Sequence, residues 1–190
     1  MGRWKEELES SWMPRRRGDY DARPAIPGER EKLLDAVAEM AFGNLAVYGN
    51  CCRSTLWAVQ THLRSEDAGT LRASAVLAGG IAGTGQTCGA VLGGLIAIGQ
   101  FLASDEFRDV ETNQRAAASA RTLVQELHSL YGSTNCYEIQ EALMGFRCDQ
   151  PSKHSRWLEE GGPTACASVC AQVARRAAAI ILEEQAGLED

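Results

Sequence analysis

Three of the seven cysteines directly follow a residue that commonly caps a helix. These pairs are Asn50-Cys51, Thr87-Cys88 and Asn135-Cys136. Cys166 follows Pro163 and Thr164 in a looser version of the pattern, and Cys170 comes one turn later. The first turn of a helix has free N–H groups and the positive end of the helix dipole, which favour a thiolate over a thiol. Because a thiolate is both a nucleophile and a ligand for soft metals, this pattern indicates redox or metal chemistry.

No short sequence motif brings enough cysteines or histidines together to form such a site. The chain has no CxxC pair, so neither a thioredoxin-type dithiol nor a zinc ribbon is indicated, and no CxxCH marks a covalent haem. None of the histidines (His62, His128, His154) lies four residues from a cysteine or from another histidine. Cys166 and Cys170 share the inward face of one predicted helix, whereas Cys52 on an apolar stripe is expected to fill core space. The site must therefore be assembled by the fold.

A glycine-rich loop precedes Cys88. Gly83, Gly85 and Gly89 superficially suggest a nucleotide site, but the GxxxxGK pattern of a P-loop is missing and no strand precedes the loop. We expect these glycines to support the cysteine site through positive φ angles and close approach of the backbone. Backbone N–H groups of the loop would be able to donate to the sulfur atoms of a cluster.

Apolar residues recur at spacings of three and four, and no convincing alternating strand pattern is present. The expected helices cover residues 29–48, 51–63, 70–78, 87–104, 112–131, 135–143 and 164–186. A long polar connection is expected over 145–163, and residues 1–28 form an irregular extension. The sequence predicts an all-α fold, a single bundle-like domain of about six to seven helices over 29–190.

Composition limits the function classes. Apolar residues make up 45% of the chain and the formal charge is −6, so the chain is expected to fold and to avoid nucleic acids. Seven cysteines are too few for a disulfide-built secreted scaffold, and an odd number leaves one thiol without a disulfide partner. We expect reduced or metal-bound cysteines in a cytoplasmic protein.

Two features that resemble membrane signals are rejected. Charged residues follow Arg15, Arg16 and Arg17 where a leader would be apolar, so no leader is expected. The stretch between Arg72 and Asp105 is uncharged and long enough to cross a bilayer, but eight glycines interrupt it. No membrane span is therefore expected.

Four segments resemble, in order, the blocks of the redox-active C-GCAxxG-C-C protein family. They are NCCRSTLWAV at 50–59, GGIAGTGQTCGAVLGGLIAIG at 79–99, YGSTNCYEI at 131–139 and CAQVARRAAAIILEE at 170–184. By this resemblance the four family cysteines are Cys51, Cys88, Cys136 and Cys170. Cys148 and Cys166 are additional, and Cys52 stands where the family usually has a small residue, so the last ligand is either Cys166 or Cys170.

The resemblance implies a redox role. A related domain occurs in split-Soret cytochromes, where it is associated with an iron–sulfur centre, so the first hypothesis is a cluster held by four cysteines for electron transfer or redox sensing. The second is a thiol-disulfide oxidoreductase that uses the same cysteines, and the third is a non-enzymatic zinc or copper protein.

The expected partners are a redox partner protein and a second copy of the chain. The helices over 87–104 and 164–186 are rich in apolar and small residues, and a homodimer would cover them. The extension carries Trp4 and Trp12, which we expect to wrap the second subunit.

Overall fold

The computed structural model describes residues 27–187, and all regular elements in this range are helical. The elements are α2 (Pro27–Tyr48), α3 (Cys51–His62), α4 (Ala68–Ala73), the 3₁₀ turn η1 (Ser74–Leu77), α5 (Gly89–Leu102), α6 (Val110–Tyr131), α7 (Cys136–Met144), the 3₁₀ turn η2 (Pro151–Lys153), α8 (His154–Glu159) and α9 (Gly162–Ala186). The predicted all-α fold is confirmed. Trp4 and Trp12, the anchors of the predicted wrapping extension, lie outside the described residues.

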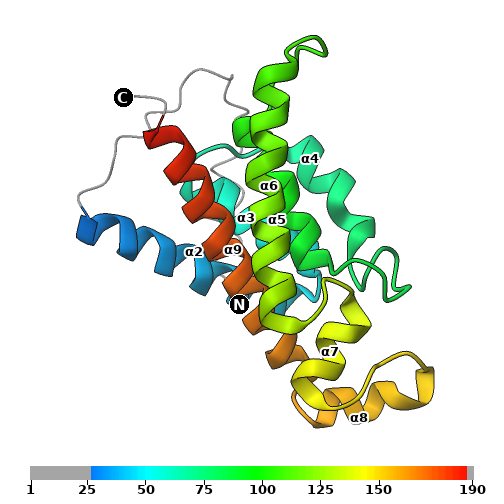
Figure 1. Ribbon diagram of the computed structural model, residues 1–190. Coiled ribbons are helices and arrows are strands. Elements are labelled where there is room, and N and C mark those ends of the chain that lie inside the picture. Colours follow the sequence, from blue (N-terminus) through cyan, green and yellow to red (C-terminus); the bar gives the residue numbers. More distant parts are fainter. Residues whose placement is uncertain (1–26, 188–190) are drawn as a thin grey trace.

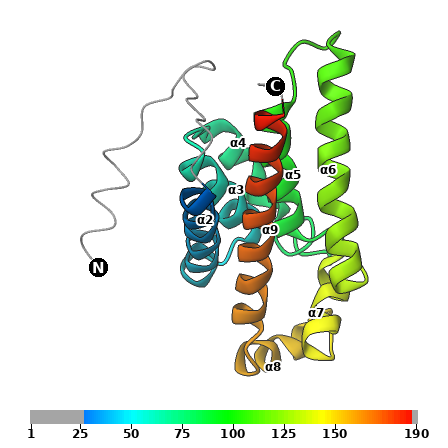
Figure 2. The same cartoon turned by 60° about the vertical axis from the view of Figure 1, so that its left-hand side comes forward.

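The central element is α9, which packs against α2, α3, α5 and α6 (Figures 1 and 2). Its alanine-rich sequence lets the neighbouring helices approach closely, and Val173, Ala177 and Ile181 are fully buried along it. Leu34, Val37, Ala41 and Leu45 are spaced three or four residues apart on α2 and are also buried. These helices form the hydrophobic core.

Two connections differ from the sequence-based prediction. Residues 145–163, expected to be a polar connection, contain η2 and α8. The helix expected over 70–78 ends at Ala73 and continues as η1. With α8, residues 27–187 contain eight α-helices. Short apolar stretches such as Trp157 and Leu158 have too few turns to produce a recognisable helical period, so the pattern missed α8.

Among the described helices, α9 alone is long and apolar enough to cross a membrane by length and composition. The central helix of a globular core passes the same test. The uncharged stretch from residue 73 to 104 is divided between the end of α4, η1, the glycine loop and α5, and α5 has 14 residues.

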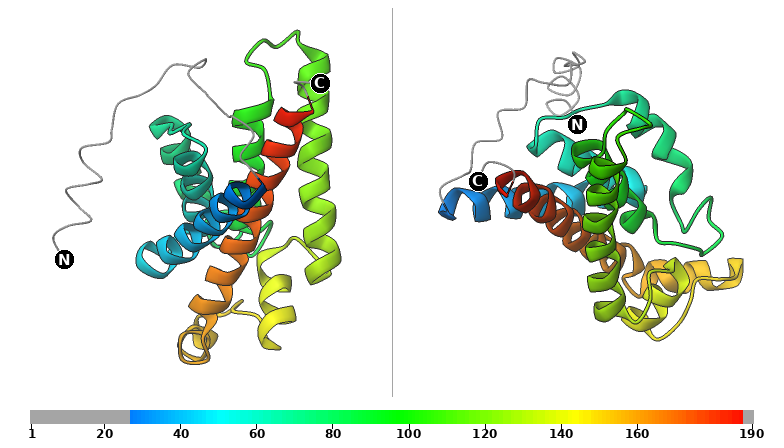
Figure 3. Two further views of the ribbon diagram at one scale, coloured as in Figure 1. Left: turned by 90° about the vertical axis from the view of Figure 1, so that its left-hand side faces the viewer. Right: turned by 45° about the horizontal axis from the view of Figure 1, so that its top comes forward.

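One end of the bundle gathers the starts of several helices. Figure 3 shows that α7 and α8 lie at the end where α9 begins. The loop before α5 joins them there, since the backbone of Thr87 pairs with that of Asn135 in an isolated antiparallel bridge.

Candidate functional site

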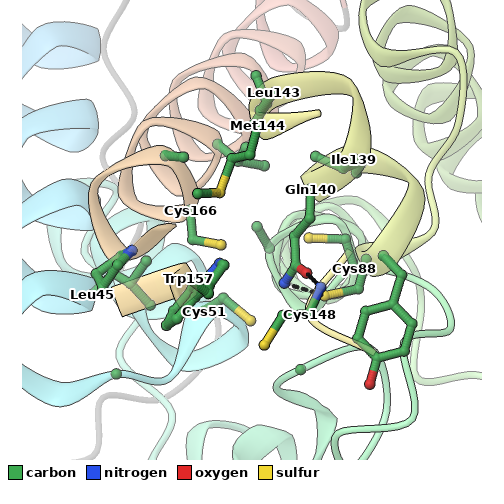
Figure 4. A pocket seen from close by; sticks show the side chains of 18 of the residues that line it. Leu45, Cys51, Cys88, Ile139, Gln140, Leu143, Met144, Cys148, Trp157 and Cys166 are labelled. Carbon is green, nitrogen blue, oxygen red and sulfur yellow. Dashed lines mark hydrogen bonds between the residues drawn. The ribbon is translucent and has the colours of Figure 1, made fainter. Parts of the chain in front are cut away.

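Four helices begin around one cavity of about 700 Å³. Cys51 is the first residue of α3, Cys88 immediately precedes α5, and Cys136 is the first residue of α7. Cys166 lies one turn into α9. Figure 4 shows the labelled Cys51, Cys88, Cys148 and Cys166 side chains arranged around this space. The fold thus brings together cysteines that are up to 115 positions apart in the chain, from 51 to 166.

The cavity lining combines thiols with apolar groups. Five of the seven cysteines line it, namely Cys51, Cys88, Cys136, Cys148 and Cys166. Within the described residues, the lining contains no Asp, Glu, Lys or Arg. Such a lining favours soft, polarisable ligands over hard, oxygen-seeking ions.

The predicted side-chain helix cap immediately before each cysteine is present at α3 and absent at α5 and α7. The Asn50 side chain accepts the Arg53 N–H at 3.0 Å, as expected, and its amide donates to the Ala75 carbonyl at 2.9 Å. At α5 the cap position is occupied by Cys88 itself and not by Thr87. Asn135 stands at the cap position of α7, but its amide donates to Glu138 at 3.3 Å.

A backbone bridge replaces those two caps. The Cys88 N–H donates to the Thr134 carbonyl at 2.8 Å, and the Cys136 N–H donates to the Gln86 carbonyl at 2.7 Å. This reciprocal pair holds the start of α5 beside the start of α7. The two cysteines are therefore positioned by hydrogen bonds between segments 48 residues apart, which local sequence patterns do not reveal.

The glycine loop turns left-handed behind these cysteines. Five successive residues, 79–83, have positive φ angles, and Ile81 and Ala82 adopt them without being glycine. Gly85 also has a positive φ of 76°, and a Cβ there would lie 2.0 Å from the Tyr137 ring, whose hydroxyl donates to the Gly83 carbonyl at 3.1 Å. The loop therefore packs on the first turn of α7.

Gly89 faces a proposed ligand directly. A Cβ at this position would lie 2.4 Å from Cys51 Sγ, closer than real Cβ contacts come. The absence of a side chain at the first position of α5 therefore leaves the space that the Cys51 thiol occupies.

Gln140 is a buried polar residue that the sequence analysis did not identify. It is 8% exposed and its two amide atoms point in different directions. Its oxygen accepts the Cys148 N–H at 3.0 Å, and its nitrogen donates to Cys136 Sγ at 3.8 Å, as the dashed lines in Figure 4 indicate. Gln140 thus links the connection after α7 to a cavity thiol.

The two cysteines of α9 occupy different environments. Cys166 lines the cavity, whereas Cys170 is fully buried outside the lining and its thiol lies 3.7 Å from the Cys51 carbonyl oxygen. Cys52 is also fully buried and away from the cavity, in agreement with a packing role. Of the two alternatives for the last ligand, the cavity geometry favours Cys166.

Cys148 has a histidine neighbour. Its Sγ lies 3.8 Å from His154 Nδ1, and the imidazole stacks on the Trp157 ring with centroids 5.7 Å apart. No histidine lies four residues from a cysteine in the sequence, so local spacing does not predict this pair. Here η2 folds the chain back, so a spacing of six residues brings the two side chains together.

The expected thiolate stabilisation at helix starts is wrong for the buried thiols. Burial is the largest cause that raises the pKa of Cys166 and of Cys136 to about 12, and repulsion from other cavity thiols comes next, first from Cys88 at Cys166 and first from Cys166 at Cys136. The pKa of Cys88 is raised by the same causes, and the Ala90 and Val91 amides only partly offset the shift. The free energy needed to move a thiolate from water into an uncharged cavity is larger than the stabilisation that the helix starts provide.

No three His, Cys, Asp or Glu side chains among residues 27–187 already stand close enough to hold a single metal ion. The cavity thiols surround a space and do not converge on one point. Their chemistry fits a soft metal group, but a bound group must fill that space or draw the thiols inward.

Comparison with known proteins identifies a family. A family model described as "Putative redox-active protein (C_GCAxxG_C_C)" matches residues 49–183, which include every cysteine of the cavity. This match confirms the resemblance found in the four cysteine blocks. Comparison with curated proteins and with solved structures gave no match.

Proposed function

The chain belongs to the redox-active C-GCAxxG-C-C family, and from that premise we propose that its cysteine cavity holds an iron–sulfur cluster for electron transfer or redox sensing. The proposed ligands are Cys51, Cys88, Cys136 and Cys166. When bound, a cluster supplies one-electron redox chemistry at a potential set by its surroundings.

The observation that carries this proposal is the uncharged cavity lined by thiols from the starts of four helices. Thiolates are the ligands that iron–sulfur clusters require. The negative charge of a thiolate-bound cluster would be offset by the positive dipole ends of α3, α5, α7 and α9. Within the described residues, no Lys or Arg side chain lines the cavity to do this instead.

The size of the cavity favours a cluster over a single ion. A structural zinc needs four ligand atoms within about 2.3 Å of one point. The thiols here surround about 700 Å³ and include no closed ion-sized group among the described residues. A polynuclear cluster, whose metal atoms each take a separate thiolate, suits this arrangement better than zinc or copper.

The raised pKa values weigh against the buried cysteines as nucleophiles. Because burial keeps Cys88, Cys136 and Cys166 protonated near neutral pH, they would react slowly in thiol-disulfide exchange. A metal group that replaces the protons avoids this problem.

The test is anaerobic purification of the full chain with absorbance, iron and acid-labile sulfide analysis. We expect a coloured protein that contains both elements. Cys51→Ser, Cys88→Ser, Cys136→Ser and Cys166→Ser should each lose iron, while the matched control Cys52→Ser retains it, because Cys52 is buried away from the cavity.

Other outcomes are equally informative. A colourless protein without iron contradicts the cluster, and stoichiometric zinc or copper in it supports the metal-protein alternative. Iron that is lost in Cys170→Ser but kept in Cys166→Ser assigns the last ligand to Cys170.

A further inference from the structure

Cys148 and His154 form a pair that the proposed ligand set does not use. They belong to the connection between α7 and α9, whereas each proposed ligand lies at a helix start. Both residues line the cavity, and Cys148 Sγ lies 3.8 Å from His154 Nδ1. Gln140 fixes the backbone at Cys148 by accepting its N–H at 3.0 Å.

We propose that Cys148 and His154 form a thiol-exchange site at the cavity mouth for small disulfides without net charge. The cavity mouth is defined by the exposed lining residues Val47, Tyr48, Leu143, His154 and Leu158. This inference concerns a different thiol from the proposed cluster ligands and does not depend on a bound cluster.

Accessibility distinguishes Cys148 from Cys88 and Cys136, which are buried. Cys51 and Cys166 are half-buried like Cys148, but Cys148 has the exposed His154 beside it. A thiol must be reachable by its reaction partner to undergo exchange, in addition to losing its proton. Burial and the neighbouring Asp149 carboxylate raise the pKa of Cys148, so this thiol needs a nearby proton acceptor, and the adjacent His154 ring nitrogen provides it.

The surroundings of the mouth select for an uncharged ligand. Val47, Leu143 and Leu158 are 73%, 45% and 50% exposed, so the entrance is apolar. Three cations of this connection are held in ion pairs: Lys153 with Asp149 and Arg156 with Glu160, each at 2.7 Å, and Arg147 with Glu141 of α7. Because these charges neutralise each other, they offer little attraction to an anionic disulfide.

The exchange step balances without an external oxidant or reductant. The Cys148 S–H bond breaks and its proton moves to His154 Nδ1, while the sulfur attacks one sulfur of the incoming disulfide. A new S–S bond forms between Cys148 and that sulfur as the original S–S bond breaks. The departing sulfur takes the proton from His154 and leaves as a thiol, so one disulfide is exchanged for another.

The experiment uses the full chain, reduced and kept anaerobic, with 2-hydroxyethyl disulfide as the neutral probe and oxidised glutathione as the charged probe. Intact mass and peptide mapping follow the adduct, and the released thiol is measured in parallel. We expect one adduct on Cys148, formed about tenfold or more faster with the neutral probe. Cys148→Ser should abolish it, and His154→Gln should slow it by about tenfold or more.

Matched controls separate this site from general effects. His128→Gln changes an exposed histidine of α6 that does not line the cavity and should leave the rate unchanged. Adducts in Cys148→Ser at the wild-type rate, equal rates with the two probes, or an unaffected His154→Gln would each overturn the proposal.

Iron analysis of the same samples separates this inference from the proposed function. Cys148→Ser should keep its iron, and loss of iron in that variant would make Cys148 a ligand and overturn the exchange site. An iron-free chain that still forms the Cys148 adduct supports the exchange site and contradicts only the cluster.

Discussion

Individual residues shape the cavity as much as the cysteines do. Gly89 is required by space, because any side chain there would occupy the position of the Cys51 sulfur. Gln140 is required by hydrogen bonding, because it is a buried amide whose partners are the Cys148 backbone and the Cys136 sulfur. Substitutions at Gly89 and Gln140 can therefore be tested without knowing whether Cys166 or Cys170 is the last ligand.

Gly89→Ala should destabilise the protein by about 1–3 kcal/mol, the range for overpacking, and reduce iron retention. The control is Gly99→Ala on the same helix, where an added Cβ meets nothing within 4 Å. That control should be neutral or stabilise by about 0.5–1 kcal/mol, because alanine favours helix over glycine. Chemical denaturation and iron analysis measure both effects, and equal losses in the two variants would contradict the role of the Cys51 contact.

Gln140→Leu should make the midpoint potential of a bound cluster more negative. Hydrogen bonds to the sulfur atoms stabilise the reduced, more electron-rich cluster, and this substitution removes such a donor at Cys136. The control is Gln100→Leu, which removes an amide that bonds Gln60 and Ser65 at a distance from the cavity. It should lower stability and leave the potential unchanged, whereas an unchanged potential in Gln140→Leu would contradict the tuning role.

At the scale of helices, the start of a helix has two opposing effects on the pKa of a thiol placed there. A helix start favours a thiolate, but the packing of several starts around one space also removes water from it. The structure shows which effect dominates without metal, since the pKa of Cys136 and of Cys166 is raised to about 12 by burial. The cavity thiols at the starts of α7 and α9 are therefore expected to lose their protons near neutral pH only when a metal takes the place of the proton.

Stability of the metal-free protein should therefore fall as pH rises above 9. The unfolded chain releases these thiol protons near pH 9, whereas the folded chain holds them to about pH 12, so the stabilisation is complete below pH 9 and lost above it. We expect a loss of about 1 kcal/mol or more by pH 10, or about 2–4 °C in Tm. A Cys136→Ser, Cys166→Ser double variant should show a smaller fall in thermal melts, and an identical fall would contradict this explanation.

At the scale of the whole molecule, the cavity lies at one end of the core. The core extends among α2, α3, α5 and α9, and at the end where α9 begins some of its residues, such as Cys88, Cys136 and Ile139, also line the cavity. A fold with this much buried apolar surface does not need a metal to hold its helices together, unlike a small zinc domain.

Removing metal with a chelator should therefore leave the far-UV circular dichroism spectrum helical and the thermal transition cooperative. The transition should shift to lower temperature by the amount that ligand binding contributes. Loss of the cooperative transition on chelation would show that the metal group is required for folding.

The homodimer remains a prediction, although the fold leaves less apolar surface for a second copy to cover than the sequence suggests. The helices whose apolar faces seemed to need a partner, α5 and α9, are largely covered by α2, α3 and α6 within the chain. Light scattering of the full chain and of a version that begins at Glu29 tests both the dimer and the wrapping by the extension. A monomer in both cases contradicts the dimer.

The longer helices, the pattern of cysteines at their starts and the family could be predicted from sequence alone, whereas α8 could not. These features depend on neighbours three or four residues apart, as in the stripe from Leu34 to Leu45, or on residue blocks that stay together in the chain. The tertiary structure alone decided that Cys166 and not Cys170 lines the cavity, that Gln140 donates to Cys136, and that His154 stands beside Cys148. Those outcomes depend on helix rotation and on contacts between distant segments, and burial then reverses the thiol acidity that the helix starts suggested.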